Sequence, residues 1–326
     1  MFYYPVMISD STIQQALAHC VSDISFRENS KTTSGKVRDI FPLNEEEMLL
    51  VVSDRISAFD FILGTVPYKG QVLNQIAAWW FKQMDEIGVH HHFIDSPHPN
   101  VSRVKVAKTL PIEVIVRGYL TGTTTTSAWY AYEYFDRMIC GIEMPGGMQK
   151  NQPFENAIIT PTTKPKVGHD KPISEIEIVE NGLVDSTVWE EIRDMAQRMF
   201  AFGQRKAREN DLILVDTKYE FGIDTDGRVM VIDEVHTPDS SRYWLSDTYM
   251  DRVTNGKEPE MLDKEFVRRM VIDNGYQVES DEDPKIYMSD DIRIEASKRY
   301  IRMYEKMTGN IFVPAEQSIM QYFESL

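Results

Sequence analysis

The stretch from Leu212 to Trp244 constrains the fold most strongly, because it combines two apolar runs with a tight-turn signal. Residues 212–215 (LILV) and 229–232 (VMVI) are short apolar runs of the kind that form buried strands. Between them, Asp226-Gly227 is typical of type I′ turns, whose central residues need positive φ. The sequence therefore predicts a β-hairpin followed by a loop that leads to Trp244.

The register of this hairpin depends on its loop. A two-residue loop places Glu220 directly opposite Asp233, and a four-residue loop keeps both on the same face. Because side chains alternate along a strand, Asp216 and Lys218 are expected on that face as well. Facing carboxylates repel each other, so a cation should compensate, either Lys218 or a divalent ion. The alternative is a solvated polar sheet face with a structural ion pair.

Polar residues in the following loop suit a phosphate group. Ser240 and Ser241 offer hydroxyl groups, and Arg242 offers a guanidinium fork. Magnesium is commonly held by one or two carboxylates together with substrate phosphates. The stretch therefore predicts a metal-dependent, phosphate-handling site with Glu220 and Asp233 as the metal ligands.

Several segments, in order, resemble one known family. LVDTKYEFG (214–222) and DEVHTPDSSRYW (233–244) closely resemble the hairpin of the SAICAR synthetases (phosphoribosylaminoimidazole-succinocarboxamide synthases), ligases of the purine pathway. Further matching segments are SGKVRDIF (34–41), SDRISAFD (53–60), LPIEVIVRGYLTG (110–122), and TPTTK (160–164) with His169-Asp170. The resemblance thus extends from about Gly35 to Trp244.

This resemblance implies an α/β (α+β) fold of two lobes. A β-rich, kinase-like N-terminal lobe over residues 1–117 would bind the nucleotide, and an ATP-grasp-related lobe over residues 118–326 would carry the substrate site and the C-terminal helices. The implied reaction joins CAIR (carboxyaminoimidazole ribotide) to L-aspartate with ATP, giving SAICAR, ADP and phosphate through an acyl phosphate. The alternative is an ATP-dependent phosphotransferase acting on a small phosphorylated metabolite.

The resemblance also implies roles for individual residues, with ATP and Mg²⁺ as cofactors. The expected catalytic residues are Lys36, Lys218, Glu220 and Asp233. The expected nucleotide-binding residues are Gly35, Lys36, Arg38, Glu113 and Asp233. The expected substrate-binding residues are Arg117, Ser127, Lys164, Asp216, Ser240, Ser241 and Arg242.

Two assignments have alternatives. The family typically continues from Gly122 with Gly-Ser, whereas this chain has four threonines before Ser127. Either Thr123 replaces the family's serine, or a four-residue insertion moves it to Ser127, which we favour because Ser-Ala-Trp recurs in relatives. Asp216 could accept a ribose hydroxyl or position Lys218.

Composition excludes several classes of protein. A net charge of −16 argues against a general nucleic-acid binder, so anionic small-molecule substrates need local basic groups and metal. No apolar run approaches the ~20 residues of a membrane span, and the N-terminus lacks the pattern of a secretory signal. Cys20 and Cys140 imply no disulfide framework, which fits a reducing cytoplasm.

Hydrophobic periodicity predicts the main helices. They are expected over 12–24, capped by Ser11, and over 70–84, 189–210, 262–274, 290–307 and 314–323. A strand is expected over 48–52. The run His90 to His92 is expected in a loop or edge strand, because neighbouring side chains of a strand alternate and cannot converge on one metal ion.

Overall fold

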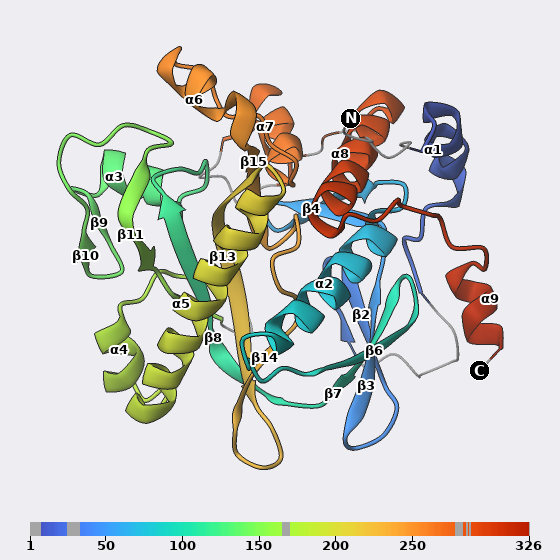
Figure 1. Cartoon of the computed structure of the whole chain (residues 1–326), viewed down its shortest axis with the longest axis horizontal. Coiled ribbons are helices and arrows are strands. Elements are labelled where there is room, and N and C mark those ends of the chain that lie inside the picture. Colours follow the sequence, from blue (N-terminus) through green and yellow to red (C-terminus); the bar gives the residue numbers. More distant parts are fainter. Residues whose placement is uncertain are drawn as a thin grey trace.

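A computed structural model of the chain contains two main β-sheets with helices packed around them (Figure 1). The structure describes residues 8–24, 33–164, 170–277, 283–284, 286 and 288–325, and every structural statement concerns these residues. Runs of strands are interspersed with helices along the chain, so the expected mixed fold of α-helices and β-strands is confirmed.

The first sheet is antiparallel and has five strands in the order β1-β2-β3-β7-β6. Their bounds are β1 (Thr33–Ser34), β2 (Arg38–Pro42), β3 (Glu47–Val52), β6 (Phe93–His98) and β7 (Val101–Lys105). A separate pair is formed by β4 (Arg55–Ala58) and β5 (Phe61–Thr65). The strand predicted over 48–52 is confirmed as β3.

Helix α2 (Lys69–Asp85) packs on the first sheet through contacts with β3, β6 and β7. It confirms the helix predicted over 70–84, and its apolar stripe is buried. Gly70 is required where the helix begins, because a Cβ there would lie 2.4 Å from the carbonyl oxygen of Val52 in β3. The start of α2 therefore touches the backbone of β3 directly.

The second sheet is built around two long neighbouring strands. Its path is β11-β8-β13-β14, with β12 paired to β8 and β15 paired to β13. The bounds are β8 (Lys108–Tyr119), β11 (Pro153–Ile159), β12 (Thr162–Thr163), β13 (Leu212–Ile223), β14 (Val229–Ile232) and β15 (Ser241–Leu245). Helix α5 (Ser186–Glu209) packs on β13 and β8. It begins three residues before the predicted Trp189, because the Asp185 side chain caps it.

The predicted register of the β13–β14 hairpin is wrong by one residue. Glu220 pairs with Ile232 rather than Asp233, and Ile223 pairs with Val229. The loop is neither of the two expected, because the Asp224 carboxylate accepts the backbone N–H groups of Asp226 and Arg228 while Gly227 adopts a φ of 81°. This odd-length loop with glycine in the left-handed region is a common three-residue hairpin connection.

The remaining elements surround the sheets. They are α1 (Asp10–Ala16) with a 3₁₀ turn over Leu17–His19, α3 (Ala128–Tyr134), β9 (Met138–Ile139), β10 (Ile142–Glu143), α4 (Glu175–Glu180), α6 (Ser246–Thr254), α7 (Glu265–Asp273), α8 (Asp290–Thr308) and α9 (Ile319–Glu324). The predicted helices 12–24, 262–274 and 314–323 are shorter than expected, and α1 is capped by Ser9 rather than Ser11. In the part of the chain described, no helix combines the length and apolarity needed to cross a bilayer.

One hydrophobic cluster connects the two sheets. It includes Trp80 of α2, Val114 of β8, Tyr219 of β13 and Tyr300 of α8, all essentially inaccessible to solvent. Figure 1 shows α8 lying against α2, on the side of the molecule that carries the first sheet. The proposed boundary between residues 117 and 118 falls inside β8, and the division into two lobes stays a prediction.

Candidate active site

The centre of the site lies on one face of the β8–β13 pair. Glu113 of β8 is directly opposite Glu220 of β13. The ammonium group of Lys218 donates to Glu113 Oε1 at 2.9 Å and also bonds to Glu220. Lys164, which follows β12, pairs with Glu220 and lies 3.8 Å from Glu113. Two buried carboxylates are therefore bridged by two ammonium groups.

Opposite charges favour the ionised forms of Glu220 and Lys218. Burial by itself raises the pKa of Glu220, but Lys218 and Lys164 outweigh burial and lower it. Burial by itself lowers the pKa of Lys218, whereas Glu220 and Glu113 raise it well above its ordinary value. The compensating cation expected from the sequence is thus supplied here by lysine. The facing carboxylate, however, is Glu113 rather than Asp233.

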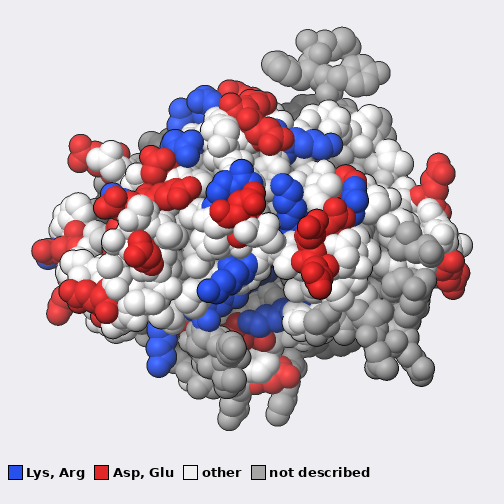
Figure 2. Space-filling model, turned by 90° about the horizontal axis from the view of Figure 1, so that it is seen from below, with Lys and Arg blue, Asp and Glu red and all other residues white. Residues whose placement is uncertain are grey.

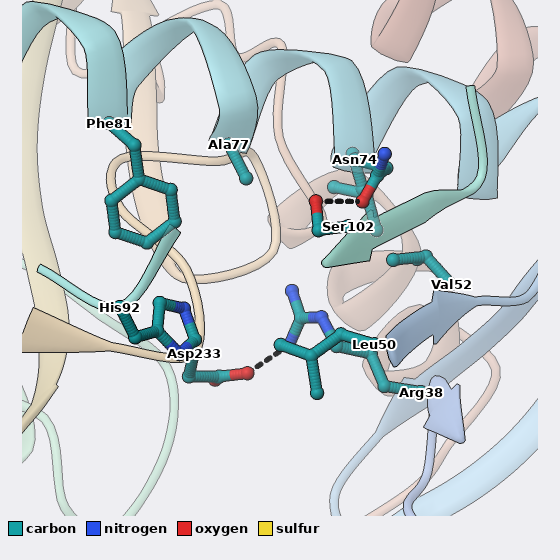
Figure 3. Close-up of a pocket in the computed structure, with 10 residues that line it drawn as sticks. Arg38, Leu50, Val52, Asn74, Ala77, Phe81, His92, Ser102 and Asp233 are labelled. Atoms are coloured by element: carbon teal, nitrogen blue, oxygen red, sulfur yellow. Dashed lines mark hydrogen bonds and ion pairs between the residues drawn. The ribbon is translucent and has the colours of Figure 1, made fainter. Parts of the chain in front are cut away.

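Asp233 joins the two sheets. It follows β14 directly with a φ of 66°, in the left-handed region, which turns the chain away from the strand. Arg38 of β2 donates from Nη1 to Asp233 Oδ1 at 2.8 Å and pairs with Glu234 through Nη2. Figure 3 shows this contact beside His92. Burial raises the pKa of Asp233 against the opposing charge of Arg38, and Glu220 and Glu234 raise it further.

His92 is the one residue of the histidine run that reaches the cavity in Figure 3. The run precedes β6, with His91 in an isolated bridge to Val231, in line with the expected edge position. His92 is 1% exposed, and its ring nitrogens have no hydrogen-bond partner among the described residues. Burial lowers the pKa of His92 to about 3, so the ring is neutral. No described group of three or more His, Cys, Asp or Glu side chains is placed to hold a metal.

Arg55 stabilises the Gly35 turn through hydrogen bonds to its backbone. The Gly35 N–H donates to the Arg38 carbonyl at 2.7 Å, which closes the turn between β1 and β2. Arg55 donates to the carbonyl oxygens of Gly35 and Lys36 at 3.1 and 3.0 Å. The Lys36 side chain is 52% exposed and pairs with Asp60. The structure thus presents Lys36 to solvent but engages Arg38 with Asp233.

A second charged centre lies nearer the start of β13, around Asp216. Asp216 is opposite Arg117 of β8 on one side and opposite Arg242 of β15 on the other. Arg242 forms an ion pair with Asp216, and Arg117 Nη1 lies 3.9 Å from the same carboxylate. Arg117 also donates to Thr160 Oγ1 at 2.7 Å and to the Thr126 carbonyl at 3.0 Å. Asp216 therefore sits between two arginines, of which Arg117 is buried and Arg242 is partly exposed.

The loop from Gly122 to Ser127 closes over these arginines. A Cβ at Gly122, whose φ is 115°, would lie 2.3 Å from the Ser127 Cβ, so the loop needs glycine there. Thr123 donates to Glu265 Oε1 at 2.7 Å. Ser127 caps α3 by accepting the Tyr130 N–H at 3.3 Å, which leaves its O–H able to donate. Ser127 is 1% exposed and the Thr123 hydroxyl is engaged with Glu265, so the choice between these two hydroxyls stays a prediction.

The serines before Arg242 serve the loop itself. Ser240 Oγ accepts the Thr237 N–H at 3.2 Å. Ser241 donates to Thr217 Oγ1 at 2.7 Å. Because side chains alternate along β13, Thr217 points away from the face that carries Lys218. The structure therefore does not bring the Ser241 hydroxyl to the face shared by the two charged centres.

Some residues that complete the site were not predicted. Glu234, Thr160, Glu265 and Arg268 all contact predicted site residues or share their partners. Arg55 belongs to the SDRISAFD segment, which the resemblance places near the substrate cleft, and it contacts the Gly35 turn. Glu234 and Thr160 lie in segments that resemble the family, but nothing local distinguishes Glu265 and Arg268 from ordinary surface charges. His169 and most of the acidic run 279–283 lie outside the described residues. Figure 2 shows Lys and Arg side chains gathered in and around a hollow, with acidic side chains among them.

The fold and the two charged centres define an enzyme that handles anionic substrates, with lysines and arginines set among buried carboxylates. The sequence model of the family described as SAICAR synthetase matches residues 31–309. A phosphoribosylaminoimidazole-succinocarboxamide synthase of Legionella pneumophila (strain Lens) is 46% identical over 294 residues, 90% of this chain and 92% of the relative. The chloroplastic enzyme of Vigna aconitifolia is 44% identical over 265 residues, 80% of this chain and 77% of the relative.

Solved structures agree with the sequence comparisons. A SAICAR synthase of Saccharomyces cerevisiae complexed with SAICAR superposes with a TM-score of 0.73 at 31% identity, covering 86% of this chain and 95% of that one. A SAICAR synthetase (Type-2) in complex with ADP shares the fold, with a TM-score of 0.66 at 21% identity, covering 86% and 99% of the chains. This chain belongs to the SAICAR synthetase family, and it is a ligase.

Proposed function

We propose that this ligase joins CAIR to L-aspartate with ATP, giving SAICAR, ADP and phosphate in purine biosynthesis. The names of the relatives and the SAICAR held by the yeast enzyme support this reaction. The observation in this chain that carries the proposal is the lysine-bridged pair of Glu113 and Glu220 beside the arginines around Asp216. The Glu113–Glu220 centre suits phosphoryl transfer, and the Asp216 centre suits binding of an anionic ribotide.

The chemistry requires two steps. A carboxylate is a poor acyl donor, because its leaving group would be oxide. A carboxylate oxygen of CAIR therefore attacks the γ-phosphorus of ATP, which releases ADP and leaves an acyl phosphate. The amine of L-aspartate then attacks the acyl carbon, the bond to the phosphate oxygen breaks, and the nitrogen loses a proton. Catalysis of the first step consists largely of positioning and charge neutralisation.

Two lysines would neutralise phosphate oxygens in the first step. Lys36 is half exposed at the Gly35 turn, so it can leave Asp60 for a phosphate group. Lys218 is fixed between Glu113 and Glu220, which keeps its ammonium charged. Arg38, beside Lys36 in the same turn, would meet the nucleotide from the side of Asp233. Gly35, Lys36, Arg38, Glu113 and Asp233 are therefore the proposed nucleotide contacts.

The carboxylates of the site fit Mg²⁺ bound together with ATP. Glu220 and Asp233 would hold the ion, which would offset the negative charge of the phosphates. Burial and neighbouring carboxylates raise the pKa of Asp233, so a nearby cation would stabilise its charged form. Magnesium usually takes only one or two protein carboxylates and completes its shell with phosphate oxygens and water. Since no described group of three or more His, Cys, Asp or Glu side chains forms an all-protein cage, the proposal relies on these two carboxylates together with phosphate oxygens and water.

The ribotide would occupy the second charged centre. Arg242 and Arg117 offer guanidinium groups for its phosphate, and Ser127 offers a hydroxyl. Asp216 holds Arg242, which favours a positioning role for this carboxylate. Lys164 lies between the two centres on Glu220, where it can meet a substrate carboxylate or phosphate. Ser240 and Ser241 would act mainly by shaping the loop that carries Arg242.

The test is ADP release by the purified protein with ATP and Mg²⁺, with CAIR and L-aspartate added separately and together. The proposal expects ADP and SAICAR only when both substrates are present. ADP released with CAIR alone would indicate a phosphotransferase instead. No ADP under any combination, from protein shown to be folded by circular dichroism, would remove the proposed reaction.

A cytoplasmic location is part of the same proposal. Cys20 and Cys140 are free thiols, as is usual for proteins of a reducing compartment. Fractionation of cells that express the full chain tests this location. Recovery in a membrane or secreted fraction would contradict it.

A further inference from the structure

Glu265 connects three parts of the second charged centre. It is the first residue of α7, and only 3% of it is exposed. Its Oε1 accepts the hydroxyl of Thr123 at 2.7 Å. Its Oε2 accepts Arg242 Nε at 3.4 Å and Arg268 Nη1 at 3.2 Å. One carboxylate thus ties the Gly122–Ser127 loop to two arginines from different elements.

The contacts of Arg242 fix the plane of its guanidinium. Asp216 binds the Nη1 edge, and Glu265 binds Nε. The third nitrogen, Nη2, faces Gly122, since a Cβ on that glycine would approach it to 3.3 Å. A planar guanidinium held at two nitrogens cannot rotate about its stem, and positioning errors of about 1 Å reduce catalysis strongly.

Glu265 is ionised at neutral pH. Burial by itself raises its pKa, but Arg242 and Arg268 outweigh burial and lower the pKa to about 2. Around the proposed ribotide site, three arginines (Arg117, Arg242 and Arg268) meet two carboxylates (Asp216 and Glu265). The buried Asp263 carboxyl lies beside them and accepts the N–H groups of Tyr243 and Glu265.

We propose that Glu265 is a positioning residue for ribotide recognition, which acts on the substrate through Arg242 and holds the Gly122–Ser127 loop in place through Thr123. This inference rests on the proposed function, in which Arg242 receives the ribotide phosphate. Glu265 itself does not touch the substrate. Its role is to present one face of the Arg242 guanidinium and the adjacent loop in a single arrangement.

The substitution Glu265→Gln distinguishes a positioning role from a simple charge effect, because the two predict opposite changes in the KM for CAIR. Removing a negative charge near an anion would by itself tighten binding of CAIR. Loss of positioning weakens it. We expect the KM for CAIR to rise at least about tenfold, in line with losing charge-assisted hydrogen bonds, while the KM for ATP stays within about twofold. An unchanged or lower KM for CAIR in a folded variant overturns the proposal.

The matched control is Glu258→Gln. Glu258 pairs with Lys150 and Arg269 at 2.7 and 2.8 Å, so it resembles Glu265 in holding two cations, but it does not contact Arg242. Its substitution should leave the KM for CAIR unchanged. If Glu265→Gln impairs folding, Thr123→Val keeps the shape of the side chain and removes only the bond to Glu265. It should raise the KM for CAIR by a smaller factor, and no change would contradict the coupling of the loop.

A double-mutant cycle tests the route of action. In an Arg242→Ala background, Glu265→Gln should add only the smaller loss of CAIR affinity that Thr123→Val produces, since the arginine that it positions is absent and only its bond to the loop remains. A multiplicative loss would show that Glu265 acts independently of Arg242 and would overturn the proposal. Failure of the proposed function is distinct, because the unsubstituted protein would then release no ADP with CAIR and L-aspartate.

Discussion

Glu113 and Glu220 face each other across the β8–β13 pair, and the ammonium group of Lys218 lies between them. Two like charges directly opposite on neighbouring strands are unfavourable unless a counter-charge is present. Lys218 is on the same strand as Glu220, two residues before it, so the alternation of β13 places acid and base on one face. The position of Glu113 is set by the partner strand.

Substitution of Lys218 by Met should remove activity and lower stability. It leaves two buried carboxylates with Lys164 as the remaining ammonium group, and breaking a buried pair typically costs about 3 kcal/mol or more. Urea unfolding and aspartate-dependent ADP release measure the two effects. Lys206→Met is the control, because its pair with Glu86 at 3.5 Å is long and partly exposed, so its loss should change stability by less than about 1 kcal/mol. Wild-type stability in the Lys218 variant would contradict the bridging role.

Asp233→Asn should abolish aspartate-dependent ADP formation without loss of the fold. The amide keeps the shape of the side chain and removes a charge that burial disfavours, so the melting temperature should not fall. Asp226→Asn, in the exposed loop of the same hairpin, should retain activity. Near-normal turnover of the Asp233 variant over a Mg²⁺ titration would remove Asp233 from the proposed metal site.

Arg242→Ala should weaken CAIR binding far more than ATP binding. The guanidinium is paired with two carboxylates, Asp216 and Glu265, at the proposed ribotide site. We expect the KM for CAIR to rise by about tenfold to a hundredfold, as for loss of a charge-assisted pair, with a small change in the KM for ATP. Arg228→Ala, at an exposed loop position, serves as the control. Equal loss for both substrates would count against the assigned role.

Asp54 should make stability depend on pH between about 4 and 6. Its buried carboxylate accepts the N–H groups of Gly70 and Val21, each at 2.8 Å, and burial raises its pKa to about 6. The folded state therefore binds the proton more tightly than the unfolded state, and stability falls as pH rises through this window. Relative to Asp54→Asn, the wild-type free energy of unfolding should decrease by about 3 kcal/mol, at about 1.4 kcal/mol for each pKa unit.

The check is urea unfolding of both proteins at several pH values, with Asp291→Asn as an exposed comparison. The difference between wild type and the Asp54 variant should be largest at the acid end and level off above pH 6. A difference that is constant with pH would show that the Asp54 carboxylate titrates at its ordinary value in the folded protein.

Local pattern predicted much of the fold but not the hairpin register. The stripe of α2 and the apolar run of β3 are visible in the sequence, because burial of one face leaves a periodic trace. The register of β13 and β14 is set by Asp224, whose side chain stabilises a three-residue loop that Asp-Gly alone does not indicate. A one-residue slip was enough to separate Glu220 from Asp233 as a facing pair.

The sequence predicted many of the site residues, but only the tertiary structure brought them together. The sequence by itself determined that Asp216, Lys218 and Glu220 share one face, and likewise Glu113 and Arg117, because alternation is a property of a single strand. It could not determine that these two faces meet, because Lys218 and Glu113 are 105 residues apart. The pairing of β13 with β8 is stabilised by the hydrophobic cluster in which α2, α5 and α8 pack. Glu265 shows the same limit, since an acidic residue at a helix start becomes part of the site only where folding places Arg242 and Thr123 against it.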